Sequence, residues 1–75
     1  MERFSERLKQ LRAAAGITQQ RLADLAGLSI GAIREYEQHL RYPILPNAAA
    51  LADALGVTLD ELAGRGPPPK KKGAR

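Results

Sequence analysis

Apolar residues recur three or four positions apart through most of the first 63 residues, which is the spacing of amphipathic helices. This spacing puts the apolar side chains of each segment on one face, where neighbouring helices can cover them. Five short helices are expected, over residues 3–14, 19–26, 30–38, 45–55 and 59–63. The side chains expected to be buried are Phe4, Leu8, Leu11, Ala15, Leu22, Leu25, Ala26, Leu28, Ile33, Leu45, Ala48, Leu51, Ala52, Leu55, Leu59 and Leu62. The pattern predicts an all-α domain.

Local signals mark the ends of these helices. Thr18 and Ser29 are expected to cap the second and third helices, because a hydroxyl oxygen accepts a hydrogen bond from a free N–H group of the first turn. Residues 58–61 have the spacing of a capping box. His39 follows the third helix, and histidine tolerates a positive φ better than most residues. These signals support the helices that the apolar spacing predicts.

The segment 18–33 carries the strongest indication of function. Two short helices meet there at a tight turn on Gly27, where a glycine adopts the left-handed conformation at little cost. Such an arrangement projects the N-terminal end of the second helix of the pair outward, where it can enter the DNA major groove.

Composition limits the classes of protein to consider. A chain of 75 residues is one domain and buries only about 60% of its unfolded surface, so the core must be compact. The absence of cysteine excludes disulfides and thiolate metal ligands, and suits a cytoplasmic protein. No apolar run approaches the ~20 residues of a membrane span, and the N-terminus does not resemble a signal peptide. We expect a cytoplasmic protein with no membrane partner.

The formal net charge of +4 is distributed unevenly. Residues 65–75 carry five basic and no acidic side chains, whereas residues 1–64 carry seven basic and eight acidic ones. Residues 64–75 are rich in proline and lysine, and are predicted to form a disordered basic tail behind a domain of residues 1–63. Because the domain itself is nearly neutral, a DNA-binding hypothesis must rest on motif geometry rather than on overall charge.

A set of short motifs occurs in register along the predicted domain. These are Leu11-Arg12, Gly16-Ile17-Thr18-Gln19, Leu22-Ala23, Gly27-Leu28-Ser29, Ile33, Tyr36-Glu37, Pro43, Ala52-Asp53-Ala54-Leu55-Gly56-Val57 and Thr58-Leu59-Asp60-Glu61-Leu62. Together they resemble the lambda repressor/Cro-like (xenobiotic-response-element type) helix-turn-helix family of DNA-binding domains. The resemblance implies a compact five-helix domain with its helix-turn-helix at the second and third helices. It also implies double-stranded DNA as partner and a homodimer on an inverted repeat, although the sequence contains no clear dimer face.

The outward arc of the third helix is expected to contact DNA bases. At about 100° per residue, Ile33, Tyr36 and Glu37 share the inward arc. The outward residues assigned to base contact are Ile30, Gly31, Arg34 and Glu35. Arg34 is the main candidate, because its guanidinium matches guanine O6 and N7; a phosphate contact or a solvated side chain is the alternative.

The other three residues of this arc have less specific interpretations. Ile30 is expected to be exposed, where it could rest on a thymine methyl group, contact a protein or serve no function. Gly31 has no side chain for reading bases but allows close approach. Glu35 could accept a hydrogen bond from cytosine N4, or weaken binding to non-target DNA sites by repelling their phosphates.

A second group of polar residues flanks this arc and is expected to contact DNA phosphates. The residues assigned to phosphate contact are Thr18, Gln19, Ser29, Gln38 and Arg41. The family resemblance suggests that Gln19 also braces the third helix, which is the recognition helix. It also suggests that Gln38 and Arg41 belong to a segment that contacts the DNA backbone. Free N–H groups at the helix N-terminus beside Gln19 favour the same phosphate.

The family resemblance also implies a structural ion pair between Arg12 and Glu37. Glu37 lies on the inward arc of the third helix, where an unpaired charge would cost several kcal/mol. The pair is expected to fix the first helix against the third.

No constellation of catalytic residues accompanies these motifs. His39 is the only histidine, and no paired carboxylates or phosphate-binding glycine loop are present, so no enzyme activity, metal or cofactor is expected. The favoured function is a sequence-specific DNA-binding transcriptional regulator, a repressor. The alternative is a protein-interaction module with Ile30 and Leu40 as contact points, or an antitoxin-like regulator that binds both a partner protein and its own operator.

Overall fold

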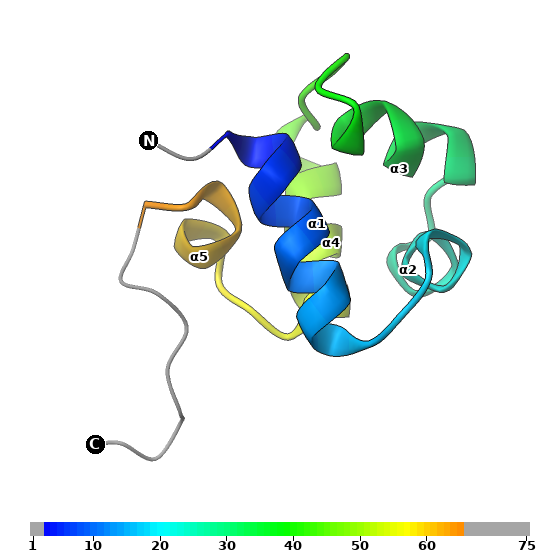
Figure 1. Ribbon diagram of the computed structural model, residues 1–75, viewed down its shortest axis with the longest axis horizontal. Helices are drawn as coiled ribbons and strands as arrows, with labels where there is room; N and C mark the ends of the chain where they lie inside the picture. Colours follow the sequence, from blue (N-terminus) through cyan, green and yellow to red (C-terminus); the bar gives the residue numbers. More distant parts are fainter. Residues whose placement is uncertain (1–2, 66–75) are drawn as a thin grey trace.

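Five α-helices make up the fold in a computed structural model that describes residues 3–65 (Figure 1). They are α1 (Phe4–Ala15), α2 (Gln19–Ala26), α3 (Ile30–Glu37), α4 (Leu45–Leu55) and α5 (Leu59–Ala63). All regular elements within this range are helices, which confirms the predicted all-α class. The predicted helix bounds agree with the observed ones to within one residue.

The helix ends follow the local signals in the sequence. Thr18 Oγ1 accepts a hydrogen bond of 3.0 Å from the backbone N–H of Arg21, and Ser29 Oγ accepts one of 3.0 Å from that of Ala32. The capping box at the start of α5 is complete in both directions. His39 has a φ of 63°, as predicted, and turns the chain away from the end of α3. Local chemistry therefore sets where α2, α3 and α5 begin.

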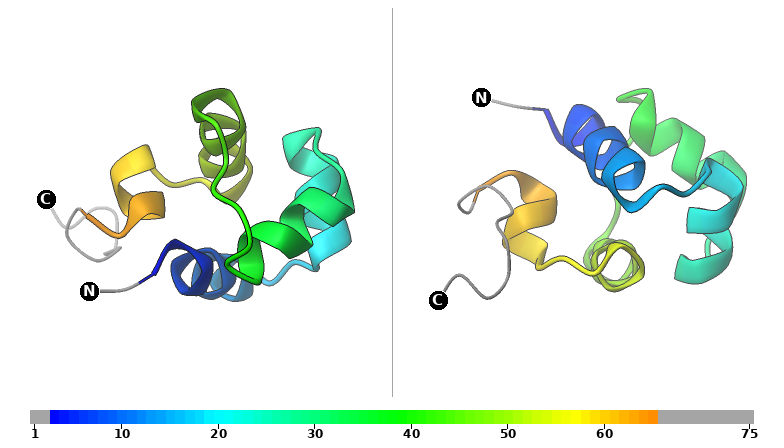
Figure 2. Two further views of the ribbon diagram at one scale, coloured as in Figure 1. Left: turned by 90° about the horizontal axis from the view of Figure 1, so that it is seen from above. Right: turned by 60° about the horizontal axis from the view of Figure 1, so that its bottom comes forward.

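The helix-turn-helix unit lies at one side of the molecule. α1 packs against α3, α4 and α5, while α2 packs against α3 and α4. In Figures 1 and 2, α2 and α3 lie on one side of the α1–α4 pair and α5 lies on the other. The α2–α3 unit consequently has its own outer surface, remote from the end where the described chain leaves α5.

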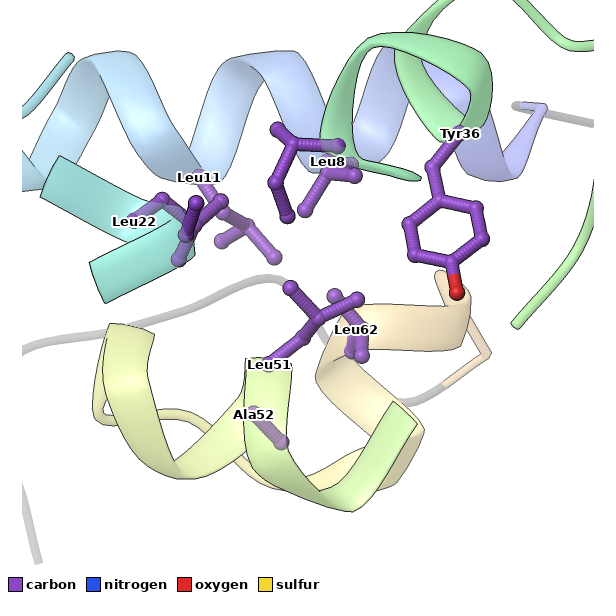
Figure 3. Packing of buried hydrophobic residues seen from close by; sticks show 9 residues of the cluster. Leu8, Leu11, Leu22, Tyr36, Leu51, Ala52 and Leu62 are labelled. Atoms are coloured by element: carbon purple, nitrogen blue, oxygen red, sulfur yellow. The ribbon is translucent and has the colours of Figure 1, made fainter. Parts of the chain in front are cut away.

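Every helix contributes at least one side chain to a common core. The largest fully buried side chains are Tyr36, Leu8, Leu22, Ile33, Leu51 and Leu62. Figure 3 shows the labelled leucines converging between the helices. Burying each such side chain contributes roughly 1.5–3 kcal/mol, so α3 is held in place by the same core that stabilises the whole fold.

Several side chains predicted to be buried are exposed instead. Leu45 and Leu59 are 68% and 42% exposed, and Ala15 is also exposed. These predictions were wrong because Leu45 and Leu59 are the first residues of their helices and Ala15 is the last of α1, so they extend past the core. Leu25 is 47% exposed, because Leu22 and Ala23 occupy the buried side of the two-turn helix α2.

Gly64 and Arg65, the first two residues of the predicted tail, lie within the described range. The N–H groups of Gly64 and Arg65 donate to the carbonyls of Glu61 and Asp60, at 3.1 and 2.9 Å. These bonds satisfy carbonyls at the end of α5, as a left-handed helix cap does. The remainder of the predicted tail, residues 66–75, lies outside the described residues.

Candidate nucleic-acid interface

The outward surface of α3 is polar and accessible. Arg34 and Gln38 are exposed, and the capping residues Thr18 and Ser29 are exposed beside them. Within the described part of the chain, no hydrogen bond or ion pair engages the Arg34 side chain. An unpaired guanidinium on an exposed helix face is free to donate to an external acceptor.

Gly31 leaves open space on the same surface. A Cβ atom at this position would meet only Ser29 Oγ, at 3.9 Å, which is ordinary van der Waals contact. Packing therefore does not require a glycine at this point of α3, where glycine costs roughly 0.5–1 kcal/mol relative to alanine.

Ile30 is not the exposed side chain that the helical arc predicted. It is partly buried and packs against the core cluster. Ile30 is the first residue of α3 and directly follows its N-cap residue, Ser29. Only part of its surface remains available to a ligand.

The inward side of α3 is fixed by a hydrogen-bonded network around Glu37. Arg12 Nε lies 2.7 Å from Glu37 Oε2, and Arg12 Nη2 donates to Oε1 at 3.1 Å. This two-bond geometry is the strongest form of an arginine–carboxylate pair. Glu37 is only 6% exposed, so the pair predicted from the family resemblance is present and largely desolvated. It joins α1 to α3.

Two further bonds extend this network to the start of α2. Arg12 Nη1 donates to the Ile17 carbonyl at 3.0 Å, and Gln19 Nε2 donates to Glu37 Oε1 at 3.0 Å. The hydrogen bond to Glu37 raises the pKa of Arg12 above its ordinary value and outweighs the opposing effect of burial. Gln19 was predicted to contact phosphate and to brace the recognition helix. Its side-chain amide N–H braces α3 by donating to Glu37, a partner that the sequence did not identify.

On the outward side, Glu35 and Arg41 are paired with each other. Arg41 Nε lies 3.1 Å from Glu35 Oε1, and the side chains are 54% and 46% exposed. The Arg41 guanidinium also lies 5.5 Å from the centre of the Tyr36 ring. These residues were assigned separately to phosphate and base contact, and no sequence reasoning anticipated their pairing. The available signal was a pair of opposite charges on either side of the turn at His39.

The loop between α3 and α4 and the first residue of α4 expose apolar side chains, of which Leu40 alone was predicted to be a surface contact. Leu40, Tyr42, Ile44 and Leu45 are each about two-thirds exposed. A cavity of about 290 Å³ opens beside them, with Phe4, Tyr42, Leu45 and Leu59 among its lining residues. An apolar surface of this kind is typical of a contact between proteins.

Two other classes of site were searched for among residues 3–65. No group of three or more potential metal ligands was found there. Their helices are also too short or too polar to span a bilayer.

The sequence profile of the helix-turn-helix family matches residues 8–62. The chain belongs to the Cro/C1-type helix-turn-helix family. The predicted resemblance is therefore confirmed, and α2 and α3 are the paired helices that give the family its name.

Three curated relatives are transcriptional regulators by name. The chain is 38% identical over 63 residues to the cryptic phage CTXphi transcriptional repressor RstR of Vibrio cholerae. It is 39% identical over 59 residues to the SPbeta prophage-derived uncharacterized regulator YonR of Bacillus subtilis, and 36% identical over 59 residues to the transcriptional activator BcrR of Enterococcus faecalis. The matches cover 84%, 79% and 79% of this chain, but only 56%, 55% and 29% of the relatives. The chain thus spans little more than half the length of the first two.

A solved structure shares both the fold and much of the sequence. The restriction-modification controller protein C.AhdI from Aeromonas hydrophila superposes with a TM-score of 0.76 and is 39% identical. The match covers 79% of this chain and 89% of that protein.

Proposed function

We propose that this helix-turn-helix protein is a sequence-specific DNA-binding transcriptional regulator that acts as a repressor. The observation that carries the proposal is the unpaired Arg34 side chain on the exposed face of α3, a helix whose inner face is fixed by the core and by Glu37. A rigid helix that presents a free guanidinium suits direct reading of guanine in the major groove. The names of the relatives support the same function.

The remaining site residues have distinct roles in this proposal. The outer surface of Ile30, the open backbone at Gly31 and the side chain of Glu35 lie beside Arg34 at the bases. The residues proposed to contact phosphates are Thr18, Gln19, Ser29, Gln38 and Arg41. Residues 66–75 supply nonspecific attraction as a basic tail behind the domain.

The proposed assembly is a homodimer on an inverted repeat. Twofold symmetry would place the two half-sites about one helical turn apart. The exposed apolar residues Leu40, Tyr42, Ile44 and Leu45 supply a surface on which a second copy can pack.

No catalytic role or cofactor is proposed. Because the target is DNA and the named relatives come from bacteria, we place the protein in the cytoplasm.

The same apolar loop favours a second candidate function, a module that binds a partner protein. DNA titration separates the two functions. We would select preferred duplexes from a randomised pool, then measure affinity for a selected and a scrambled duplex at about 50 and 200 mM salt. A DNA-binding protein loses affinity steeply as salt rises, because each phosphate contact releases counterions.

A matched pair of variants identifies the residue that reads bases. Arg34→Ala is expected to reduce the ratio of specific to nonspecific affinity by about 5- to 150-fold, the equivalent of the roughly 1–3 kcal/mol that a base-reading arginine contributes. Lys9→Ala removes an exposed positive charge from α1 and should leave this ratio unchanged. If the wild-type protein binds neither duplex at low salt, the DNA-binding function is wrong and the protein-interaction module is favoured.

A further inference from the structure

The pairing of Glu35 with Arg41 bears on how the proposed interface is regulated. Arg41 follows α3, and its side chain returns to the helix, where Nε lies 3.1 Å from Glu35 Oε1. Its guanidinium lies 5.5 Å from the centre of the Tyr36 ring, at a distance where a cation is attracted to an aromatic face. Arg41 is therefore held by two contacts on the side of α3 that leads to the proposed DNA surface.

The Tyr36 ring provides a rigid support for this arrangement. Tyr36 is 1% exposed, and its hydroxyl accepts a hydrogen bond of 3.2 Å from Asn47 Nδ2. The ring also meets Phe4 edge-on, with centroids 6.5 Å apart. Because the ring cannot move without disturbing the core, the position of the Arg41 guanidinium depends on its other partner, the half-exposed carboxylate of Glu35.

The Glu35–Arg41 pair is weak enough to exchange partners. Exposed ion pairs contribute little to stability, because water competes for both charges. A DNA phosphate is an equally good acceptor for a guanidinium, with the additional gain of counterion release. Arg34, by contrast, has no such partner within residues 3–65 and is available to a ligand from the outset.

We propose that Glu35 masks Arg41 by pairing with it. On non-target DNA, Arg41 then makes no phosphate contact, and the protein has one such contact fewer than it would have with Arg41 free. This inference rests on the DNA-binding function proposed above. While the pair is closed, the Glu35 carboxylate lies 3.1 Å from Arg41 Nε and offsets the positive charge of the guanidinium. At the target site, the contacts of the rest of α3 hold the protein long enough for a phosphate to replace the Glu35 carboxylate. Glu35 therefore limits retention on random sequence.

The test is a double-mutant cycle measured on a scrambled duplex over a range of salt concentrations. Glu35→Gln keeps the shape of the side chain and removes its charge. It is expected to raise affinity for this duplex about two- to fivefold, the range that an exposed ion pair allows. It should also steepen the dependence of log K on log salt by about 0.9, the value for one added phosphate contact. In the Arg41→Gln background, Glu35→Gln should change neither quantity.

Two outcomes overturn the masking role while leaving DNA binding intact. An equal gain in both backgrounds means that Glu35 repels phosphate directly rather than acting through Arg41. A loss of affinity in Glu35→Gln means that Glu35 holds Arg41 in its binding position. If the wild-type protein binds no DNA at all, the proposed function itself fails, which is a different result from either of these.

A measurement without DNA tests the pair itself. Because the Glu35 carboxylate lies 3.1 Å from Arg41 Nε, the chemical shift of this nitrogen in nuclear magnetic resonance spectra should differ between the wild-type protein and Glu35→Gln. The Arg12 Nε–H, bonded to Glu37, is the internal control and should be unaffected. An identical Arg41 Nε chemical shift in the two proteins would show that the masking contact is not formed in solution.

Discussion

Glu35 and Glu37 lie two residues apart on α3 but in opposite environments. Glu37 is 6% exposed and accepts hydrogen bonds from Arg12 and Gln19, whereas the Glu35 side chain is 46% exposed and, among residues 3–65, pairs only with Arg41. The same chemical group thus joins three helices on one face of α3 and forms an exchangeable contact on the other. Helix phase decides which side of α3 each carboxylate faces, since residues two apart face different sides.

The magnitudes of the two interactions differ for a physical reason. Removing one partner of a buried pair leaves an uncompensated charge and costs about 3–5 kcal/mol, while an exposed pair contributes about 0–1 kcal/mol. The inner face of α3 therefore determines whether the helix is in place, and the outer face determines what it binds. Substitutions on the two faces should separate stability from DNA affinity.

The largest expected difference is between the two isoleucines of α3. Ile33 is fully buried, so Ile33→Ala should lower the free energy of unfolding by about 3–4 kcal/mol through lost burial and the cavity left behind. Ile30 is only partly buried, and Ile30→Ala should cost about 1–2 kcal/mol. Urea unfolding followed by circular dichroism measures both values. Equal losses would contradict the assignment of Ile30 to the edge of the core.

The two glutamates provide the next comparison. Glu37→Gln should lower the free energy of unfolding by about 2–4 kcal/mol, somewhat less than a fully buried pair because the Arg12 side chain is 21% exposed. Glu35→Gln, with the same change of charge on the same helix, should alter it by less than about 1 kcal/mol. Thermal and urea unfolding of both variants decide this prediction. If they unfold alike, the inner network does not stabilise the fold.

The pH dependence of the inner pair follows from Arg12. Because Glu37 raises the pKa of Arg12, the contribution of Arg12 to stability is fully present below the pKa of a free arginine and is lost only as pH rises through the higher folded value. The guanidinium consequently stays charged throughout the neutral range.

The smallest effect is expected at Gln19. Gln19→Ala removes one hydrogen bond to Glu37 but leaves both bonds from Arg12, so it should cost only about 0.5–1.5 kcal/mol. Gln20→Ala is the matched control, because the Gln20 side chain donates to Asp24 on the exposed face of α2 and not to Glu37. Urea unfolding gives the stability difference between the two variants. A loss at Gln20 as large as that at Gln19 would show that Gln19 does not brace α3.

Much of the fold could be predicted from the sequence because its determinants are local. Thr18, Ser29 and the capping box at Thr58 act over three residues, and the apolar spacing identifies Leu8, Leu22 and Ile33 as core residues. The exposure of Leu45 and Leu59 could not be predicted in this way. Helical phase gives the direction of a side chain around its own helix. It does not give how far the neighbouring helices extend along that helix, which decides whether a residue at its end is covered.

The sequence predicted the direction of a site residue only where the phase of a single helix sets that direction. The free outward position of Arg34 follows from helix phase, and Arg12 and Glu37 were paired only through resemblance to the family. The Glu35–Arg41 contact depends instead on the path of the chain after the positive φ of His39, which returns Arg41 to the helix it has just left. Helical spacing gives no information about contacts between a helix and the loop that follows it.

The empty position at Gly31 has a consequence for how the recognition surface can change over time. Within the described residues, a Cβ atom there would meet Ser29 Oγ at an ordinary contact distance of 3.9 Å, and the backbone is that of an ordinary helix. A single codon change could add a reading group beside Arg34 without disturbing the core. The preference for one operator over another can thus diverge between related copies of this gene while the scaffold stays the same.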